Sequence, residues 1–417
     1  MVRRHSAAAS AAPTARLAWR PGRAHVLAVA VPVFLSACHD LATAPTSEQP
    51  LSVAGNLRFL SISAGALHTC GVAATGTTFC WGWNRDGELG DGSRSDRAFP
   101  VPVASPTAFT LVSAGGGHTC GLDADGAAYC WGFNLSGQLG DSSTTTRVAP
   151  TAVAGGLKFI RLVSGGAFTC GVRTDSSAAC WGYGAWGQLG NGLREDHRAP
   201  VAVLDGPNLV AASVGAAHGC ALAADSSALC WGKNDFGQLG DSTRSDTAAP
   251  VRVRDGRKFV AVAVGFQHSC GLLATGEAYC WGDNQLAQLG DTSVAQSSVP
   301  IPVAGAFVFT RLSAGGSHTC GITADHTARC WGSDANGQLG SAPTHTCVGL
   351  SVTGPCSPVP QLVGGGYGFV EISAGTQHTC AVATDQRAYC WGLNSNGQLG
   401  SASLVAVAAS LALDAQP

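Results

Sequence analysis

The sequence has 417 residues, of which 56 are glycine, one is methionine and only 12% are charged. Glycine weakens helix interiors and is typical of turns, so this composition excludes a mainly helical enzyme and favours many short strands. The formal net charge is −2, and the 17 cysteines indicate disulfides or metal sites.

Residues 1–37 have the pattern of a secretory signal peptide. Five arginines and no acidic residue are followed by the apolar run HVLAVAVPVFLSA, which is too short to span a membrane. The sequence LSAC ending at Cys38 resembles the lipobox of bacterial lipoproteins, which implies a lipid on Cys38. Ordinary secretion with an unpaired cysteine is the alternative. His39 stands where an inner-membrane retention signal would have Asp, so we predict an exported lipoprotein of the outer membrane or cell surface, with a tether at 38–49.

Cleavage before Cys38 changes the charge balance of the chain. The 24 basic residues minus five arginines leave 19 against 26 acidic residues, a formal charge of −7. Phosphate binding needs a concentrated basic surface, so we expect no nucleic-acid partner. The lipid would be the chain's contact with the membrane.

An internal repeat organises residues 50–417. The block HTCGVAATGTTFCWGWNRDGELG at 68–90 occurs in seven versions, spaced by 50 residues and by 60 before the last. Each unit has four short runs, which we expect to form an antiparallel meander that starts with the PVPV-like run. The second unit shows them at Val101–Val103, Phe109–Ala114, His118–Leu122 and Ala128–Gly132. The predicted fold is all-β, a seven-bladed β-propeller of four-stranded antiparallel blades.

Each repeat has two cysteines ten residues apart, on either side of a hairpin turn. A three-residue loop at 74–76 would place Cys70 opposite Cys80 on a non-hydrogen-bonded rung, with Cα atoms about 4.5 Å apart, which suits a disulfide. Metal ligation and free buried thiols are the alternatives, although zinc sites need closer pairs. The predicted disulfides are Cys70–Cys80, Cys120–Cys130, Cys170–Cys180, Cys220–Cys230, Cys270–Cys280, Cys320–Cys330 and Cys380–Cys390.

The pattern CGL…YCWGxNxxGQLG, with glycine pairs before HTC, resembles the regulator of chromosome condensation repeat family from about Pro50 to the C-terminus. The resemblance implies a seven-bladed propeller. Its nuclear member promotes nucleotide exchange on a small GTPase through a face-mounted insertion, and secreted bacterial members include a protein inhibitor of β-lactamases. The paired cysteines are not part of the ordinary family repeat.

Most other recurrent residues are interpreted as structural. The tryptophan after the second cysteine suits the wedge between blades, with a stacking platform as the alternative. The histidine before the first cysteine is expected to be a hydrogen-bonded core imidazole rather than a metal or proton site, because Phe168 replaces it in the third repeat. The asparagine of WGxN should organise the following turn. Asp91 and its equivalents suggest a calcium site. Asn191 and Ser341 occupy the same position in two other repeats, which argues against it.

Differences between repeats indicate where function lies. The loops after GQLG are polar and variable and open on one face, as expected of a binding surface, although unconstrained drift is the alternative. We predict a non-catalytic, monomeric propeller that binds an unidentified protein or envelope polymer, without catalytic residues, cofactor or metal. An exported hydrolase or lyase with a site at the central channel is the alternative, for which no catalytic motif departs from the repeat pattern.

An insertion at 341–359 distinguishes the sixth repeat. It adds ten residues and contains Cys347 and Cys356, which we expect to form the eighth disulfide because every other cysteine except Cys38 is paired. We predict that this stapled loop projects from the face of the variable loops and binds the partner, since a pre-ordered loop loses less entropy. Protection from proteolysis is the alternative. The candidate binding residues are Thr344, His345, Thr346, Val348 and Leu350.

Two segments compete to close the ring of blades. Pro50–Val53 matches the first run of a unit, and Ser410–Leu413 lies where an eighth such run would begin. We expect one of them to pair with the blade of the other terminus, and removal of residues 410–417 to lower the melting temperature.

Overall fold

The computed structural model of the chain describes residues 46–53, 56–204, 208–348 and 353–401. The predicted signal peptide, Cys38, Leu350 and residues 410–413 lie outside the described residues. Among the residues that are described, no helix is long and apolar enough to cross a membrane.

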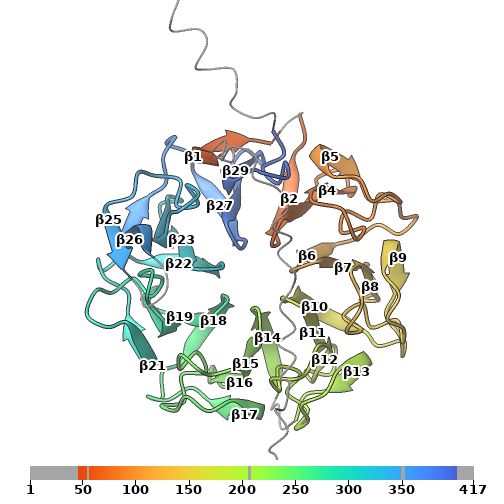
Figure 1. The fold of residues 1–417 in the computed structure, drawn as a ribbon, viewed down its shortest axis with the longest axis horizontal. Helices are drawn as coiled ribbons and strands as arrows, with labels where there is room; N and C mark the ends of the chain where they lie inside the picture. Colours follow the sequence, from red (N-terminus) through yellow and green to blue (C-terminus); the bar gives the residue numbers. More distant parts are fainter. Residues whose placement is uncertain (1–45, 54–55, 205–207, 349–352, 402–417) are drawn as a thin grey trace, which may run out of the picture. The chain divides into compact units, whose positions relative to one another are not determined.

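The described residues form seven antiparallel sheets, arranged as blades in a ring (Figure 1). Blade 1 contains β2 (Phe59–Ala64), β3 (His68–Ala73), β4 (Thr78–Gly82) and β5 (Arg97–Pro102). Blade 2 contains β6 (Leu111–Ala114), β7 (His118–Leu122), β8 (Ala128–Gly132) and β9 (Arg147–Ala152). Blade 3 contains β10 (Phe159–Ser164), β11 (Phe168–Arg173), β12 (Ala178–Gly182) and β13 (His197–Ala202). Blades 4 and 5 contain β14 (Leu209–Val214), β15 (His218–Ala223), β16 (Ala228–Gly232) and β17 (Thr247–Arg252); and β18 (Phe259–Val264), β19 (His268–Leu273), β20 (Ala278–Asp283) and β21 (Gln296–Pro302). Blade 6 contains β22 (Phe309–Ala314), β23 (His318–Thr323), β24 (Ala328–Ser333), β26 (Thr353–Leu362) and β25 (His345–Val348), and blade 7 contains β27 (Phe369–Ala374), β28 (His378–Ala383), β29 (Ala388–Leu393) and β1 (Thr46–Ser52).

This architecture confirms the predicted all-β, seven-bladed propeller of four-stranded antiparallel blades, with a fifth strand in blade 6. The blade boundaries were predicted wrongly. The PVPV-like run does not begin a sheet: β5 pairs with β4, with Cys80 opposite Val101, and forms the outer strand of the preceding blade. The length of a repeat does not show where one sheet ends, because the spacing between equivalent residues is the same wherever the repeat is taken to begin. The variable loops therefore connect two strands within a blade.

Seven hairpins have the geometry that the spacing of the cysteines predicts. Ala73 N donates to Thr77 O at 2.9 Å, and Gly76 has a positive φ of 82°. This turn places Cys70 opposite Cys80 with their Cα atoms 4.1 Å apart, and all seven hairpin pairs form disulfides. With Cys347–Cys356, the described residues form eight disulfides, which indicates an oxidising, exported environment.

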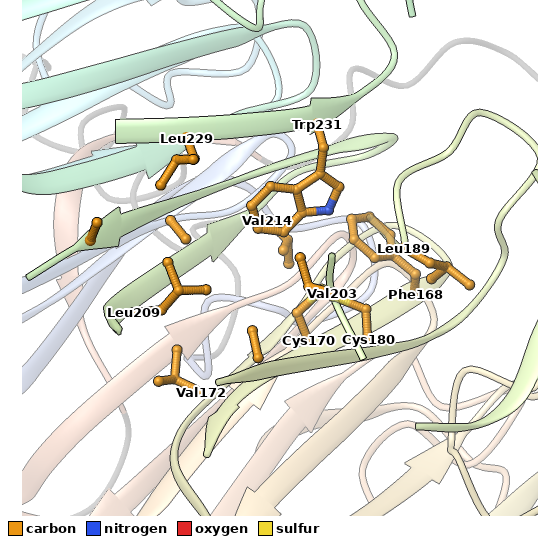
Figure 2. Packing of buried hydrophobic residues seen from close by; sticks show 13 residues of the cluster. Phe168, Cys170, Val172, Cys180, Leu189, Val203, Leu209, Val214, Leu229 and Trp231 are labelled. Atoms are coloured by element: carbon orange, nitrogen blue, oxygen red, sulfur yellow. A yellow bond between two sulfur atoms is a disulfide. The ribbon is translucent and has the colours of Figure 1, made fainter. Parts of the chain in front are cut away.

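The core lies between the blades. Trp131 of blade 2 packs with Val72, Cys80 and Leu89 of blade 1, and its Nε1 donates to the carbonyl oxygen of Glu88 at 2.9 Å. The tryptophans at this position are at most 1% exposed, which confirms their role as wedge residues. Figure 2 shows the corresponding cluster of blades 3 and 4, around Trp231. The last glycine of GQLG packs against the tryptophan of the next blade. A Cβ at Gly90, which has a φ of +66°, would be 2.7 Å from Trp131 Nε1.

The N-terminal segment closes the ring. Strand β1 pairs with β29 of blade 7, with Leu51 opposite Cys390, and Val53 N donates to Ala388 O at 2.9 Å. Of the two candidate segments, the described structure assigns this place to the N-terminal one. Strand β1 begins at Thr46, so it includes four residues that were assigned to the tether.

The insertion lies within blade 6 and forms a hairpin rather than a loop between blades. Strand β26 pairs with β24 up to Cys356, opposite Ser333, and extends three residues further. Strand β25 pairs with residues 353–356, and the disulfide Cys347–Cys356 connects the two strands. The inserted hairpin, β25 with β26, therefore adds an edge to this blade and extends beyond the end of β24.

Candidate functional site

Long loops and short turns meet on one face of the propeller, which we call the loop-bearing face. Because strand direction alternates, the turn after β2 and the loop after β4 lie at the same end of each blade. Asn84 organises the loop: its Oδ1 accepts from Leu89 N at 3.0 Å, and its Nδ2 donates to Ser95 O at 3.0 Å. Equivalent bonds at Asn134, Asn234, Asn284 and Asn394 confirm the predicted role of the WGxN asparagine.

The aspartates that suggested calcium are bound by their own loops. Asp91 accepts from Ser93 N at 2.9 Å and from Arg97 Nε at 3.0 Å. Burial raises the pKa of Asp91, but these hydrogen bonds outweigh burial and hold the pKa below its usual value. In the described part of the chain, no group of three or more His, Cys, Asp or Glu residues could hold a metal ion. The aspartates thus order the loops.

The recurrent histidines form hydrogen bonds between blades. His68 Nε2 lies 2.8 Å from Thr119 Oγ1, and that hydroxyl donates to Glu88 O at 2.8 Å. The single hydroxyl proton is used for the carbonyl, so the imidazole must donate from Nε2. Burial lowers the pKa of His68 to about 4, so the ring is neutral at pH 7. This confirms the predicted core imidazole. The equivalent pairs are His118 with Thr169, His218 with Ser269, His268 with Thr319, His318 with Thr379, and His378 with Thr69.

One interface lacks both members of this pair. Blade 3 has Phe168 in place of the histidine, and blade 4 has Gly219 in place of the hydroxyl residue. Phe168 is fully buried in the cluster with Val214 and Trp231 (Figure 2). Gly184, another departure of this repeat, replaces the loop-organising asparagine: a Cβ there would lie 1.8 Å from the carbonyl oxygen of Glu195. These departures are therefore packing changes.

The channel mouth on this face is lined by the turns after the inner strands. It forms a depression of about 80 Å³, whose lining residues include no ionisable side chain. A Cβ at Gly65 would lie 2.6 Å from the carbonyl oxygen of Gly115, so the glycines let neighbouring turns approach. This mouth offers backbone and small side chains, which are poor material for acid–base catalysis.

Three aromatic residues occupy one position of the loop-bearing face in consecutive blades. Trp83, Phe133 and Tyr183, which we call the aromatic arc, follow the WG pair of blades 1, 2 and 3 and are half-buried. Each lies beside the short turn of its own blade, with Trp83 N donating to Leu67 O at 2.9 Å. The loops that follow the arc in blades 2 and 3 contain two further exposed apolar residues, Leu135 and Trp186, which are 67% and 39% exposed.

The arc is uncovered because the sheet ends earlier in these blades. In blade 1 the last pair joins β4 to β5 at Gly82 and Arg97, one residue before Trp83. In blades 5 to 7 the ladder includes the next residue, and the side chains at that position are buried. These pairs are Asp283 with Gln296, Ser333 with Cys356, and Leu393 with Thr46. One half of the face is therefore aromatic and uncovered, and the other half is covered by outer strands.

Two cations stack on this aromatic half. The guanidinium of Arg85 lies 5.1 Å from the Trp83 ring centroid, and Lys233 Nζ of blade 4 lies 4.5 Å from that of Trp186. Trp186 thereby joins blades 3 and 4. Cations over aromatic faces contribute about 0.5–1 kcal/mol at exposed sites and order the rings. The aromatic half is thus a partly ordered, amphipathic surface.

A groove lies at the rim of the same face, between the inserted hairpin and blade 5. It has a volume of about 460 Å³ and is lined by residues 345–348 together with the loop at 284–295. Three of the predicted binding residues, His345, Thr346 and Val348, line this rim groove, and Thr344 precedes them. Val348 is 78% exposed. Their role in binding remains a prediction.

The sequence reasoning missed the aromatic arc because it compared the repeats for what they share. The signal was the x of WGxN, which reads Trp, Phe, Tyr, Lys, Asp, Ser and Leu along the chain. An aromatic residue in three consecutive copies, at a position that the fold does not fix, is a departure worth testing. Whether that position is covered could not be read from the sequence.

Glu88 has a buried carboxyl, and its backbone carbonyl accepts hydrogen bonds from Thr119 and Trp131 of blade 2. It replaces the glutamine of GQLG, is 1% exposed, and its Oε2 accepts from Asp86 N at 2.9 Å. Burial raises its pKa to about 7, and nearby acidic groups add to this, although backbone hydrogen bonds oppose it. Glu88 is therefore partly protonated at neutral pH.

Replacing Glu88 with glutamine is expected to stabilise the protein at high pH only. The carboxyl has a pKa of 4.5 when unperturbed and about 7 in the native state, so the native state binds more protons between these values and stability falls as pH rises through them. Above pH 7 the free energy of unfolding is lower by the full amount, about 3 kcal/mol. Denaturant unfolding should show a gain for E88Q at pH 8 and little at pH 5. An equal gain at both pH values would contradict this assignment.

Sequence comparisons assign the repeats to a known family. Two models of the regulator of chromosome condensation (RCC1) repeat match the chain, and together their matches cover more than half of it. One matches residues 59–88, 109–138, 210–238, 259–288, 309–338 and 369–398. The other matches residues 75–122, 125–172, 180–222, 225–272, 275–322 and 330–382. No curated protein has a significantly matching sequence.

Solved structures share the fold at low sequence identity. Human WBSCR16 is 19% identical with a TM-score of 0.70, over 83% of this chain and 89% of that one. Yeast RCC1 (Prp20), solved bound to Kap60, is 21% identical with a TM-score of 0.70, over 94% of this chain and 88% of that one. Prp20p from Saccharomyces cerevisiae, described with its binding to Gsp1p and histones, is 19% identical with a TM-score of 0.68, over 87% of this chain and 97% of that one. On these repeats and this fold, the chain belongs to the regulator of chromosome condensation (RCC1) repeat family.

Proposed function

We propose that this protein is a non-catalytic, exported binding protein whose loop-bearing face binds another protein. The observation that carries the proposal is the aromatic arc, which is partly exposed on three consecutive blades, while the equivalent position is buried on three others. Aromatic residues are enriched at the centres of protein interfaces, where truncating one often costs more than 1 kcal/mol. The variable loops would form the polar rim around this centre.

Two of the similar solved structures are described together with proteins that they bind. The yeast propeller was solved with Kap60, and the Saccharomyces cerevisiae protein is described with Gsp1p and histones. These partners belong to those proteins, and at about 20% identity the likeness carries over the fold alone. For the present chain we propose a partner in the compartment to which it is exported.

We further propose that a lipid on Cys38 anchors the mature protein. Strand β1 begins at Thr46, eight residues after Cys38. A fully extended chain of that length spans at most about 29 Å. The anchor would therefore hold blade 7 close to the membrane surface.

The alternative of an exported enzyme has weaker support. The described residues include two carboxyls with pKa values raised to about 7, Glu88 and Glu371, in both cases mainly by burial. Each accepts a backbone N–H, from Asp86 and Ile62 respectively. They replace residues that are uncharged or basic in the other repeats, and neither lines the channel mouth. We therefore favour binding.

The test compares capture of envelope proteins by the mature chain and by a variant that lacks the arc. The triple variant Trp83→Ala, Phe133→Ala and Tyr183→Ala is expected to bind the captured protein at least tenfold more weakly, about 1.4 kcal/mol. A matched control removes exposed apolar side chains at the other end of the inner strands: Leu60→Ala, Ile160→Ala and Val210→Ala. Equal affinity of the arc variant and the control, with both folded, would contradict the proposal.

A further inference from the structure

In every blade, the strand that pairs with the outer side of β4, or of its equivalent in that blade, contains proline. Proline has no N–H to donate to a neighbouring strand, and natural proteins use it on edge strands to prevent pairing with other chains. The prolines are Pro100 in β5, Pro150 in β9, Pro200 in β13, Pro250 in β17, Pro300 in β21, Pro360 in β26 and Pro50 in β1. The outward edges of these strands are thus protected against strand addition.

Blade 6 is the exception, because β25 lies outside its proline-containing strand. The sheet order ends with β26 and then β25, so β25 provides the outer edge of this blade. Its sequence, His-Thr-Cys-Val, has no proline and includes two β-branched residues, which favour strands. Among the described strands that face outward, β25 alone has an edge that proline does not block.

The register shows which backbone groups of β25 face that edge. Pro355 O accepts from Asp334 N at 2.8 Å, so the backbone of Pro355 is directed towards β24. Thr346 is opposite Pro355 and therefore forms a non-hydrogen-bonded pair with it, so the N–H and C=O of Thr346 point away from β26. Val348, two residues later, has the same orientation. No described strand pairs with these groups.

The rim groove lies along this strand. All four residues of β25 line it, and the opposite wall includes Ala287, Val294 and Ala295 beside polar residues. That wall is held by Asn284, whose Nδ2 donates to Val294 O at 2.7 Å. On the other side, the disulfide Cys347–Cys356 fixes β25 to β26. Both walls are therefore ordered before anything binds, which lowers the entropic cost of binding.

We propose that β25 binds an extended segment of a partner polypeptide by strand addition in the rim groove. Paired N–H and C=O groups at two alternate residues match the backbone of an extended chain, and the apolar wall would receive its alternate side chains. A volume of about 460 Å³ suits a short segment rather than a folded domain. This inference rests on the proposed binding function, but it concerns the inserted hairpin and not the aromatic arc.

The test uses a phage-displayed library of random linear peptides, panned on the disulfide-intact mature protein. Thr346→Pro removes the edge N–H, whereas Thr346→Val keeps the N–H and the β-branched shape. Selected peptides should bind the proline variant at least tenfold more weakly and the valine variant unchanged. Methylation of single backbone nitrogens in a selected peptide should weaken binding at every second residue. Val348→Pro provides a second blocked edge if Thr346→Pro does not fold.

Several results would overturn the inference. Peptides that bind both proline variants normally, or a methylation scan without alternation, would exclude strand addition, as would a failure to enrich any peptide. Peptides that lose binding only in the arc triple variant would support the proposed function and reject β25 as the site. Dimerisation of the protein that Thr346→Pro abolishes would make a second copy of this chain the occupant.

Discussion

A chain that lacks residues 46–53 is expected to melt at least roughly 5 °C below the mature protein. Strand β1 is the outer strand of blade 7, and Val53, only 5% exposed, packs with Trp81 of blade 1. Losing four or five hydrogen bonds at about 1 kcal/mol each, together with about 2 kcal/mol from burial of Val53, gives a loss of about 6 kcal/mol. Differential scanning calorimetry would measure the shift.

The deletion should also promote association. Without β1 the outer edge of blade 7 would be β29, whose sequence AYCWGL has no proline. Unpaired edges of this kind pair with other chains. Sedimentation velocity should therefore show dimers or larger species for the deleted chain. A monomer with an unchanged melting temperature would show that β1 contributes little to ring closure.

Deletion of residues 410–417 is the matched control. The sequence alone led us to expect a lower melting temperature, because this segment matched the first run of a repeat. Since β1 occupies the edge of β29, we now expect the melting temperature to stay within about 1 °C. A decrease as large as that caused by loss of β1 would mean that the C-terminal segment also stabilises the seam.

Phe168→His is expected to destabilise the protein strongly, although histidine is the residue at this position in the other repeats. In blade 4 the position of the hydroxyl partner is Gly219, so the imidazole would be buried without an acceptor for its Nε2 proton. An unsatisfied buried donor costs about 1–3 kcal/mol, and lost packing of the phenyl ring adds to it. Denaturant unfolding should show a loss of about 3 kcal/mol.

The double variant Phe168→His with Gly219→Ser should recover much of this loss. The pair His218–Ser269 of blades 4 and 5 is the precedent, with the ring nitrogen and hydroxyl 2.9 Å apart. Val264 is opposite Ser269 in the sheet, as Val214 is opposite Gly219. A Cβ at Gly219 would lie 3.2 Å from Val214 Cγ1, so a small shift suffices. The coupling energy of the double-mutant cycle should be about 1–3 kcal/mol. Additive effects would show that the two departures are unrelated.

Local spacing determined much of this protein. The separation of ten residues from Cys70 to Cys80, with turn residues midway, fixes a hairpin register, because a three-residue loop leaves one way for the strands to pair. The tryptophan after the second cysteine and the histidine before the first were correctly assigned to the core, since seven equivalent tryptophans and six equivalent histidines can share one environment only between equivalent neighbours. These features depend on contacts within one hairpin or on the period itself.

Tertiary structure decided what the period leaves open. The sequence could not say whether Val101 belongs to the blade before or after it, because strand pairing is non-local and the repeat can be cut at any point. The same ambiguity hid the choice of β1 over residues 410–413 at the seam. It also hid the uncovered position of Trp83 and the free edge of Thr346, because exposure depends on how far a neighbouring strand extends, which the residue's own sequence context does not encode.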